Sequence, residues 1–330
     1  MPLPSDYNDA IQALTLKFKD PIIKQGSIAE RDAMGLPIPY SGNFACVYKI
    51  RADGKIWALR FFLVITPKTT ARYKAIKNFF NTSNCDFFVD FDFQEDAVLI
   101  SGKWHPMVKM PWIDGRTLDR FVNDNLATPN KIEKIANDFS KIIFQLKILK
   151  IAHGDLQHGN ILVTNSGLKL IDYDCFFCST TKTIATNEIG MPNYQHPKRK
   201  ATDIGENIDD FSAWIIYISL KIISKDVSYF NNNDTLIFEK DDFEFPKNSR
   251  RIKSIIQHKD SEIRAFGKFI VNALLSPTVQ SVPKFDLSTI TKFIGSDKTQ
   301  TNYWWTDSRS NKTKTIVNNS TWIKDWLKKN

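Results

Sequence analysis

The order of apolar and polar residues predicts a strand-rich first part of the chain. Between residues 44 and 113, the stretches FACVYKI and KIWALRFFLVI flank Asp53-Gly54, a dipeptide typical of a tight hairpin turn. The stretch FFVDFDFQEDAVLISGKWHPMVKMPW predicts two more strands, with a turn at Glu95-Asp96. Between the two pairs, TPKTTARYKAIKNFF has aromatic and aliphatic residues at helical spacing. We therefore expect a small antiparallel sheet accompanied by one helix.

The second part of the chain has the periodicity of amphipathic helices. In NKIEKIANDFSKIIFQLKILK, apolar residues recur every three or four positions. The buried face that this spacing predicts consists of Ile132, Ile135, Phe139, Ile142, Leu146 and Leu149. Further helical patterns cover residues 208–224 and 260–275, and the strands ILV and LKLI form a hairpin around residues 165–167. The tail at 302–329 predicts a short helix that carries tryptophans.

Length and charge are those of a globular protein with a basic surface. The chain has 330 residues, 42% of them apolar, which is enough for a large single domain or for two lobes that share a cleft. Lys and Arg number 45 against 36 Asp and Glu, and the net charge of +9 favours phosphate-rich or acidic partners. Because this charge is dispersed along the sequence, we do not expect nucleic-acid binding.

Targeting and cysteine patterns suggest a reducing, cytoplasmic location. The longest apolar stretch, FSAWIIYISLKII at 211–223, is short and contains Lys221, so it predicts a buried helix and no membrane span. The first residues have no basic segment followed by an apolar core, so secretion is not expected. Four cysteines are too few for a disulfide scaffold, and Cys175 and Cys178 have no second Cys or His pair nearby. We expect neither zinc nor haem.

Three polar residues surround the small hairpin in a pattern typical of phosphoryl transfer. Asp155 and Asn160 lie five residues apart before its first strand, and Asp172 follows its second strand. Asn160 and Asp172 offer hard oxygen ligands that can converge on Mg²⁺, and Asp155 is then free to accept a proton from an incoming hydroxyl. A cleft between a β-rich and a helical lobe is a common position for a small-molecule site.

These residues also resemble motifs of the protein-kinase superfamily. HGDLQHGN resembles its catalytic loop, DYD resembles its Asp-Phe-Gly, and GMPNYQHPK is similar to the end of its activation segment. SGNFACVY is similar to a reduced glycine-rich loop, WALR to Val-Ala-Ile-Lys, and DDFSAWIIYISL to a buried helix of the family. The matches follow the family's order from about residue 40 to 225. GLPIPYSGNFACVY, KMPWIDG and NYQHP also resemble strings in bacterial Ser/Thr-kinase-like proteins.

The resemblance implies an α+β, bilobal protein-kinase-like fold with a small β-rich N-lobe and a larger, mainly helical C-lobe. It implies an N-terminal extension at 1–35 that packs on the kinase domain, an N-lobe with hinge at 36–113, a C-lobe at 114–295 and a tail at 296–330. It also implies ATP and Mg²⁺ as cofactors, and phosphoryl transfer to Ser or Thr of a protein substrate or of the chain itself. The identity of the substrate stays open.

The resemblance assigns roles to individual residues. Asp155 would orient and deprotonate the acceptor hydroxyl, and Asn160 and Asp172 would hold Mg²⁺ against the phosphates. His153 would act structurally, by packing under the loop and bonding to backbone near Asp172. The implied nucleotide pocket consists of Gly42, Ala45, Val47, Ala58, Arg60, Met110, Pro111 and Ile113.

Several positions depart from the family's pattern. Arg60 stands in place of the usual lysine, and the helix KTTARYKAIKNFF offers no acid to pair with it. The usual ion pair is therefore absent, or Arg60 pairs with another carboxylate that the sequence does not identify. Asp174 replaces the glycine of Asp-Phe-Gly, and Gly154 replaces the catalytic-loop arginine, so we expect no requirement for activation-loop phosphorylation. Two alternatives follow: a nucleotide-binding pseudokinase that acts as a scaffold or switch, and a small-molecule kinase of the aminoglycoside or choline phosphotransferase type. The activation-segment motif favours a protein substrate.

Overall fold

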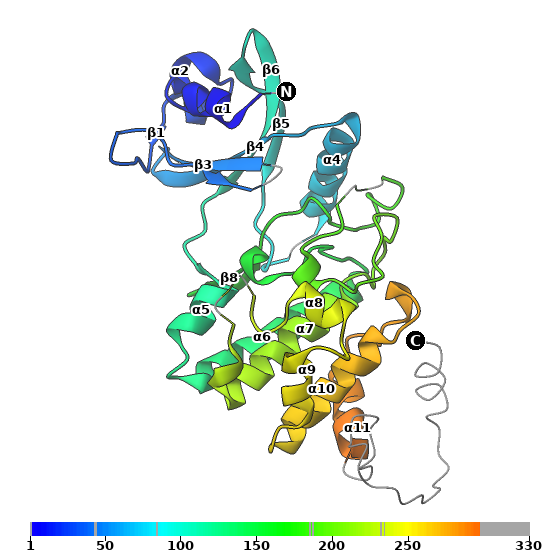
Figure 1. Ribbon diagram of the computed structural model, residues 1–330. Coiled ribbons are helices and arrows are strands. Elements are labelled where there is room, and N and C mark those ends of the chain that lie inside the picture. Colours follow the sequence, from blue (N-terminus) through cyan, green and yellow to red (C-terminus); the bar gives the residue numbers. More distant parts are fainter. Residues whose placement is uncertain are drawn as a thin grey trace, which may run out of the picture. The chain divides into compact units, whose positions relative to one another are not determined.

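The computed structural model describes residues 2–42, 45–83, 85–184, 186, 188–231, 233 and 235–297. The chain divides into two units, residues 1–294 and 295–330. The first contains the features that follow, except that its last helix runs on to residue 297. It has an α+β fold in which the longer strands precede residue 112 and most of the long helices follow it (Figure 1).

The strand-rich part holds an antiparallel sheet with the order β1-β3-β4-β6-β5, and β2 pairs with β3. Its strands are β1 (Ser27–Ile28), β2 (Tyr40–Ser41), β3 (Ala45–Ala52), β4 (Lys55–Phe62), β5 (Asp92–Ile100) and β6 (Lys103–Pro111). Between β3 and β4, Asp53 and Gly54 have positive φ values of 51° and 68°, as a tight two-residue hairpin requires. The predicted hairpin is confirmed.

The predicted turn at Glu95-Asp96 is wrong. Strand β5 continues through both residues, and the chain reverses at Ser101-Gly102, where φ is 47° and 76°. The register between β5 and β6 is irregular between Gln94 and Val98, so the acidic pair lies in a bulge of an edge strand. Charged residues are common at exposed sheet edges. In the sequence, two acidic residues in such a bulge therefore look like the polar residues of a turn.

Short helices at the start of the chain pack on this sheet. They are α1 (Pro4–Ile11), α2 (Leu14–Lys17) and α3 (Pro21–Lys24), and α1 and α2 lie beside the sheet in Figure 1. Tyr7 stacks on Phe61 with ring centroids 4.8 Å apart and donates a hydrogen bond to the Phe62 carbonyl oxygen at 2.8 Å. Asp20 accepts from the first N–H groups of α3 and forms a buried ion pair with Lys109 of β6. The first residues therefore share one core with the strands.

The helical part is arranged around α6 and α7. Its helices are α5 (Leu118–Asp124), α6 (Pro129–Ile148), α7 (Asp210–Lys225), α8 (Lys240–Glu244), α9 (Arg250–Ile256), α10 (Ser261–Leu274) and α11 (Leu287–Asp297). The small sheet β7-β8-β9 consists of β7 (Arg116–Thr117), β8 (Ile161–Thr164) and β9 (Gly167–Leu170). The predicted helices and hairpin are thus confirmed, as is the helix of the strand-rich part, α4 (Pro67–Thr82).

One residue of the predicted buried helix face is misplaced. Leu149 is 42% exposed, whereas the other five residues of that face are buried. Helix α6 ends at Ile148, Leu149 is its capping residue, and the chain turns away through a positive φ of 55° at Lys150, so Leu149 lies at the exposed end of the helix. The tryptophan-bearing tail at 302–329 lies outside the described residues.

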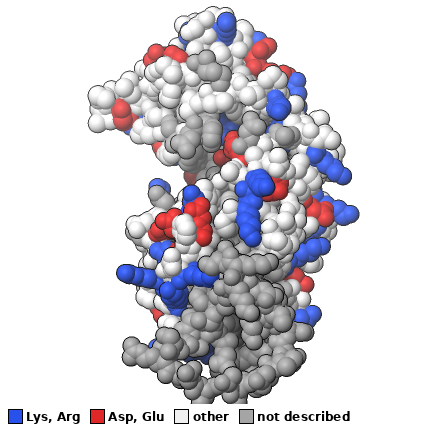
Figure 2. Space-filling model, turned by 45° about the vertical axis from the view of Figure 1, so that its right-hand side comes forward, with Lys and Arg blue, Asp and Glu red and all other residues white. Residues whose placement is uncertain are grey.

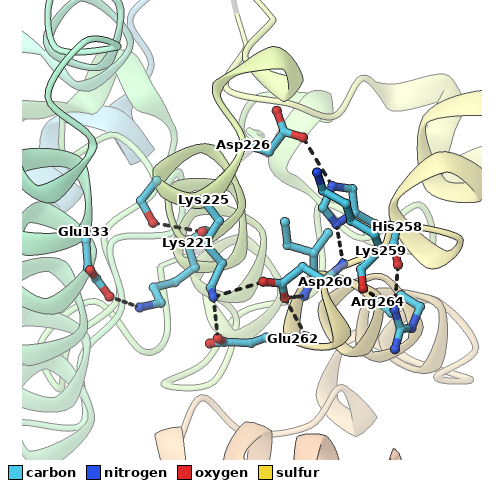
Figure 3. A network of polar contacts seen from close by, with 11 residues as sticks. Glu133, Lys221, Lys225, Asp226, His258, Lys259, Asp260, Glu262 and Arg264 are labelled. Carbon is cyan, nitrogen blue, oxygen red and sulfur yellow. Dashed lines mark hydrogen bonds and ion pairs between the residues drawn. The ribbon is translucent and has the colours of Figure 1, made fainter.

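A polar network joins the ends of α7 and α10 (Figure 3). Lys225 near the end of α7 pairs with Asp260 and Glu262 at 3.4 and 2.9 Å, and Asp260 caps α10. His258 accepts from the Asp260 N–H through Nδ1, so Nε2 carries the proton and donates to Asp226 at 3.2 Å. This network stabilises the helical part at a distance from the candidate site.

The surface and the helices give two further observations. On the face shown in Figure 2, basic and acidic side chains are interspersed over the described residues. None of the described helices combines the length and the apolar character needed to span a membrane.

Candidate active site

A cavity of about 460 Å³ contains much of the predicted site. The residues predicted from the sequence that line it are Gly42, Ala45, Val47, Arg60, Asp155 and Asp172. The remaining wall consists of Tyr40, Asp174 and residues 188–192. Figure 2 shows a hollow between the upper and lower parts of the visible face, with acidic side chains beside it. The volume lies within the range of about 300 to 1,000 Å³ that is typical of small-molecule sites.

The other predicted residues lie outside this lining. Ala58 is buried in β4 and faces Met110 across the β4–β6 ladder, whereas Pro111 ends β6 and is exposed. Ile113 follows that strand and is half-buried, and Asn160 is buried behind Asp155. The structure therefore brings six of the predicted site residues to the wall of one cavity. The predicted residues outside this wall are Ala58, Met110, Pro111, Ile113 and Asn160.

The backbone around Asp155 is held by buried polar groups. His153 Nδ1 accepts from the Asp155 N–H at 3.4 Å, so its Nε2 carries the proton and donates to the Ile171 carbonyl oxygen at 2.9 Å. The carboxylate of Asp209, at the start of α7, accepts from the N–H groups of His153 and Gly154 at 2.6 and 2.9 Å. The structural role predicted for His153 is confirmed, and the same bonds position Asp155.

The Asp155 carboxylate is oriented by one bond to each oxygen. Oδ1 accepts from the Met191 N–H at 2.7 Å, and Oδ2 accepts from Asn160 Nδ2 at 3.1 Å. Asn160 Nδ2 also donates to the Asp155 carbonyl oxygen at 2.9 Å. A carboxylate offers about four acceptor positions, so lone pairs remain for a hydroxyl that enters the cavity.

Gly154 is required by the close approach of another segment. It has a φ of +82°, and a Cβ at this position would lie 2.2 Å from the carbonyl oxygen of Cys175. Both the left-handed backbone and the lack of space exclude a side chain. The local path of the chain therefore leaves no room for an arginine at this position.

Asp174 is the carboxylate partner of Arg60 that the sequence did not identify. Arg60 Nη1 donates to Asp174 Oδ1 at 3.1 Å, and Nη2 donates to Oδ2. Arg60 Nη1 also donates to the Tyr73 hydroxyl at 2.6 Å, which in turn donates to Asp174. The Arg60 and Asp174 side chains are 9% and 14% exposed. Burial opposes the charge on Arg60, but Asp174 and Tyr73 raise the pKa of the guanidinium well above its ordinary value.

Helix α4 contacts the segment around Asp174 through an arginine and a tyrosine. Its buried Arg72 donates to the carbonyl oxygens of Asp174, Phe176 and Ile184 at 3.2, 2.9 and 2.6 Å. Tyr73 supplies the second link through its hydroxyl. Sequence reasoning missed these contacts, although the acid-free helix and the unexpected Asp174 were both visible and suggested a rearranged ion pair.

The cavity contains more negative than positive charge. Asp155, Asp172, Asp174 and Glu188 line it together with Arg60. Desolvation, with Asp174 and Asp155 nearby, raises the pKa of Asp172 even though Arg60 Nη2 lies 3.6 Å away. Desolvation and the charges of Asp174 and Asp172 raise the pKa of Glu188 to about 7. Such a site favours a cation.

The residues present fit a magnesium ion held jointly by protein and substrate. Among the described residues, no three His, Cys, Asp or Glu side chains converge as a preformed metal site. Mg²⁺ is commonly bound by one or two carboxylates together with substrate phosphates and water. Asp172, whose side chain is 42% exposed in the cavity, fits this role, whereas Asn160 is hydrogen-bonded to Asp155.

Comparison with known proteins leaves the chain unassigned. No family model matches it, and no curated protein sequence matches it significantly. The function must therefore be inferred from the residues of the site and their geometry.

Proposed function

We propose that the protein is an ATP- and Mg²⁺-dependent phosphotransferase with a bilobal protein-kinase-like fold, and that it transfers the γ-phosphate to Ser or Thr of a protein. The single observation that carries the proposal is the oriented carboxylate of Asp155, in the same cavity as Asp172 and Arg60. The order of the kinase-like motifs along the chain supports it.

In the proposed reaction, Asp155 accepts the proton of the acceptor hydroxyl. The oxygen of that Ser or Thr hydroxyl attacks the γ-phosphorus, and ADP leaves. A positioned general base contributes roughly 10² to 10⁴ in rate. Arg60 has five N–H donors, and those not bonded to Asp174 and Tyr73 can contact phosphate oxygens. Asp172 would hold Mg²⁺, which neutralises phosphate charge when bound.

A second candidate is a pseudokinase that binds nucleotide without transferring phosphate. Two observations favour it. Asp174 already compensates the charge of Arg60, which lowers its attraction for phosphate, and the Met191 N–H occupies one acceptor position of Asp155. Such a protein would keep nucleotide binding and lack catalysis.

Labelled ATP separates the candidates. The purified protein is incubated with γ-labelled ATP and Mg²⁺, alone and with generic protein substrates, beside Asp155→Asn and Asp172→Asn. Asp90→Asn is the matched control, because the Asp90 side chain is 74% exposed. We expect transfer by the wild type and the control, and a loss of roughly 10² to 10⁴ in rate for Asp155→Asn. Undiminished transfer by Asp155→Asn would exclude Asp155 as the base.

Thermal stability with and without nucleotide tests the second candidate. A ligand at 100 times its Kd stabilises a protein by about 2.7 kcal/mol. Stabilisation by ATP and Mg²⁺ without any transfer favours the pseudokinase. No stabilisation at all contradicts both candidates.

A further inference from the structure

A second cavity, of about 240 Å³, adjoins the first. The two share Ile189, Gly190 and Pro192 as a common wall. Pro197 and Phe243 give the second cavity apolar sides, and Gln195 and Arg199 contribute polar groups. The second cavity is large enough for a single amino-acid side chain. Because it lies beside the candidate active site, a side chain of the acceptor substrate could enter it.

Two buried side chains of this cavity have unused hydrogen-bond donors. Gln195 is 6% exposed; its Oε1 accepts from Arg199 Nη1, but its Nε2 has no partner among the described residues. Arg199 is 9% exposed, and its Nε is also without a partner there. Within the described ranges, no carboxylate forms an ion pair with Arg199. The cavity therefore contains a buried cation for which the described part of the chain supplies no counter-ion.

A buried cation in this state favours an anionic ligand. A buried donor without an acceptor destabilises the protein, and a buried charge without a counter-charge destabilises it more. Arg199 also borders a small space of about 10 Å³, roughly the volume that one water needs. A water there can bond to an N–H group, but it does not neutralise the guanidinium. An anion in the 240 Å³ cavity would do so.

The other charged side chains that line this cavity do not compensate the charge of Arg199. Lys240 and Glu244, four residues apart on α8, form an exposed pair at 3.2 Å and largely cancel. Burial and the charge of Lys198 lower the pKa of His196 to about 4, so His196 is neutral at pH 7. Among the described residues that line this cavity, Arg199 is therefore the charged group without a partner of opposite charge.

Gln195 lies close to the predicted base. A Cβ placed on Gly190 would be 2.6 Å from Asp155 Oδ1 and 2.7 Å from Gln195 Nε2. Both polar atoms thus pack closely against Gly190. Because one extended residue spans about 3.5 Å, a side chain in the second cavity would belong to a residue close in sequence to the one at Asp155.

We propose that the second cavity binds the carboxylate of an Asp or Glu residue that neighbours the phosphate-accepting Ser or Thr. The inference rests on the proposed function and specifies its substrate: an acidic acceptor segment. Arg199 binds the carboxylate through its free N–H groups, Gln195 Nε2 donates a further hydrogen bond, and the apolar walls cover the methylene groups.

Peptide binding tests this without requiring catalysis. Each fluorescent peptide contains one Ser. In separate peptides, Glu, Gln or Leu is placed at one of the two positions before this Ser or at one of the two positions after it. Their Kd is measured for the wild type, Arg199→Gln, Gln195→Met and the control Arg250→Gln, which changes an exposed arginine of α9. At one position, we expect the Glu peptide to bind about tenfold more tightly than the Gln peptide, which corresponds to about 1.4 kcal/mol.

The variants define the outcome. Arg199→Gln should abolish the preference for Glu, Arg250→Gln should keep it, and Gln195→Met should weaken both polar peptides. If Arg199→Gln does not fold, as its thermal unfolding would show, Gln195→Met carries the test. Equal or undetectable binding of all peptides by the wild type, or an unchanged preference in a folded Arg199→Gln, overturns the inference.

The same peptides separate this inference from the proposed function. A preference for Glu in binding, with no phosphate transfer to any peptide, contradicts the proposed function and retains the carboxylate site. Transfer that is equally efficient for Glu and Gln peptides supports the proposed function and overturns the carboxylate site.

Discussion

Replacing Asp174 by Asn tests the rearranged ion pair directly. The substitution keeps the shape of the side chain and removes the charge that faces Arg60. Removing one partner of a buried pair costs about 3 to 5 kcal/mol, because the other charge stays buried. Arg60 keeps its bond to Tyr73 and a more distant Asp172 at 3.6 Å, so we expect a loss near the lower end, about 3 kcal/mol.

The corresponding change in melting temperature follows from the size of the unit. Unfolding entropy is about 2.1 cal/mol/K per residue, or roughly 0.6 kcal/mol/K for residues 1–294. A loss of about 3 kcal/mol therefore lowers Tm by roughly 5 °C. Urea unfolding followed by circular dichroism and a thermal scan measure the two quantities independently.

A surface pair and a double variant serve as controls. Asp90→Asn removes the partner of Lys77 at an exposed site and should change the free energy of unfolding by less than about 0.5 kcal/mol. Arg60→Met combined with Asp174→Leu removes both charges and should cost less than the sum of the single changes, with a coupling of about 2 kcal/mol or more. Additive effects, or a loss for Asp174→Asn no larger than for Asp90→Asn, would refute the reasoning.

Three further predictions concern pH and backbone. Burial opposes the charge on Asp20, but hydrogen bonds from Lys109, Gln94 and the Ile23 N–H outweigh it and lower the pKa of this carboxyl. The stabilisation that the Asp20 carboxylate provides is therefore complete above about pH 4 and is lost as the pH falls further. In urea unfolding, Asp20→Asn should lose about 3 kcal/mol at pH 7 and much less at pH 3. Burial raises the pKa of Glu188 from 4.5 to about 7, so stability present below pH 4.5 is lost as the pH rises through 7. Glu188→Gln should therefore be more stable than the wild type by about 1 kcal/mol at pH 8, and equal to it at pH 4. Gly154→Ala should lower the free energy of unfolding by at least about 2 kcal/mol more than Gly35→Ala does. Gly35 has a similar φ of +80° but open space around it, so the difference measures the steric clash at Gly154. Equal losses would contradict the steric argument.

Local features could be predicted because they depend on residues close in sequence. The β3–β4 hairpin follows from Asp53-Gly54 and the flanking strands, and α4 and α6 follow from their helical spacing. The grouping of Asp155, Asn160 and Asp172 was also visible, because one short hairpin brings them together. The incorrect turn at Glu95-Asp96 shows the limit, since a bulge and a turn have the same local polarity.

Contacts between distant residues could not be predicted in this way. Asp174 is 114 positions from Arg60, and Arg72 contacts the carbonyl oxygen of Ile184 across 112 positions. Whether such groups meet depends on the path of the whole chain, and on which charges remain buried once other partners are satisfied. The sequence by itself determined the local elements and the polar hairpin. Only the tertiary structure decided the partner of Arg60 and the position of the unpaired Arg199, because long-range side-chain pairing has no local periodicity.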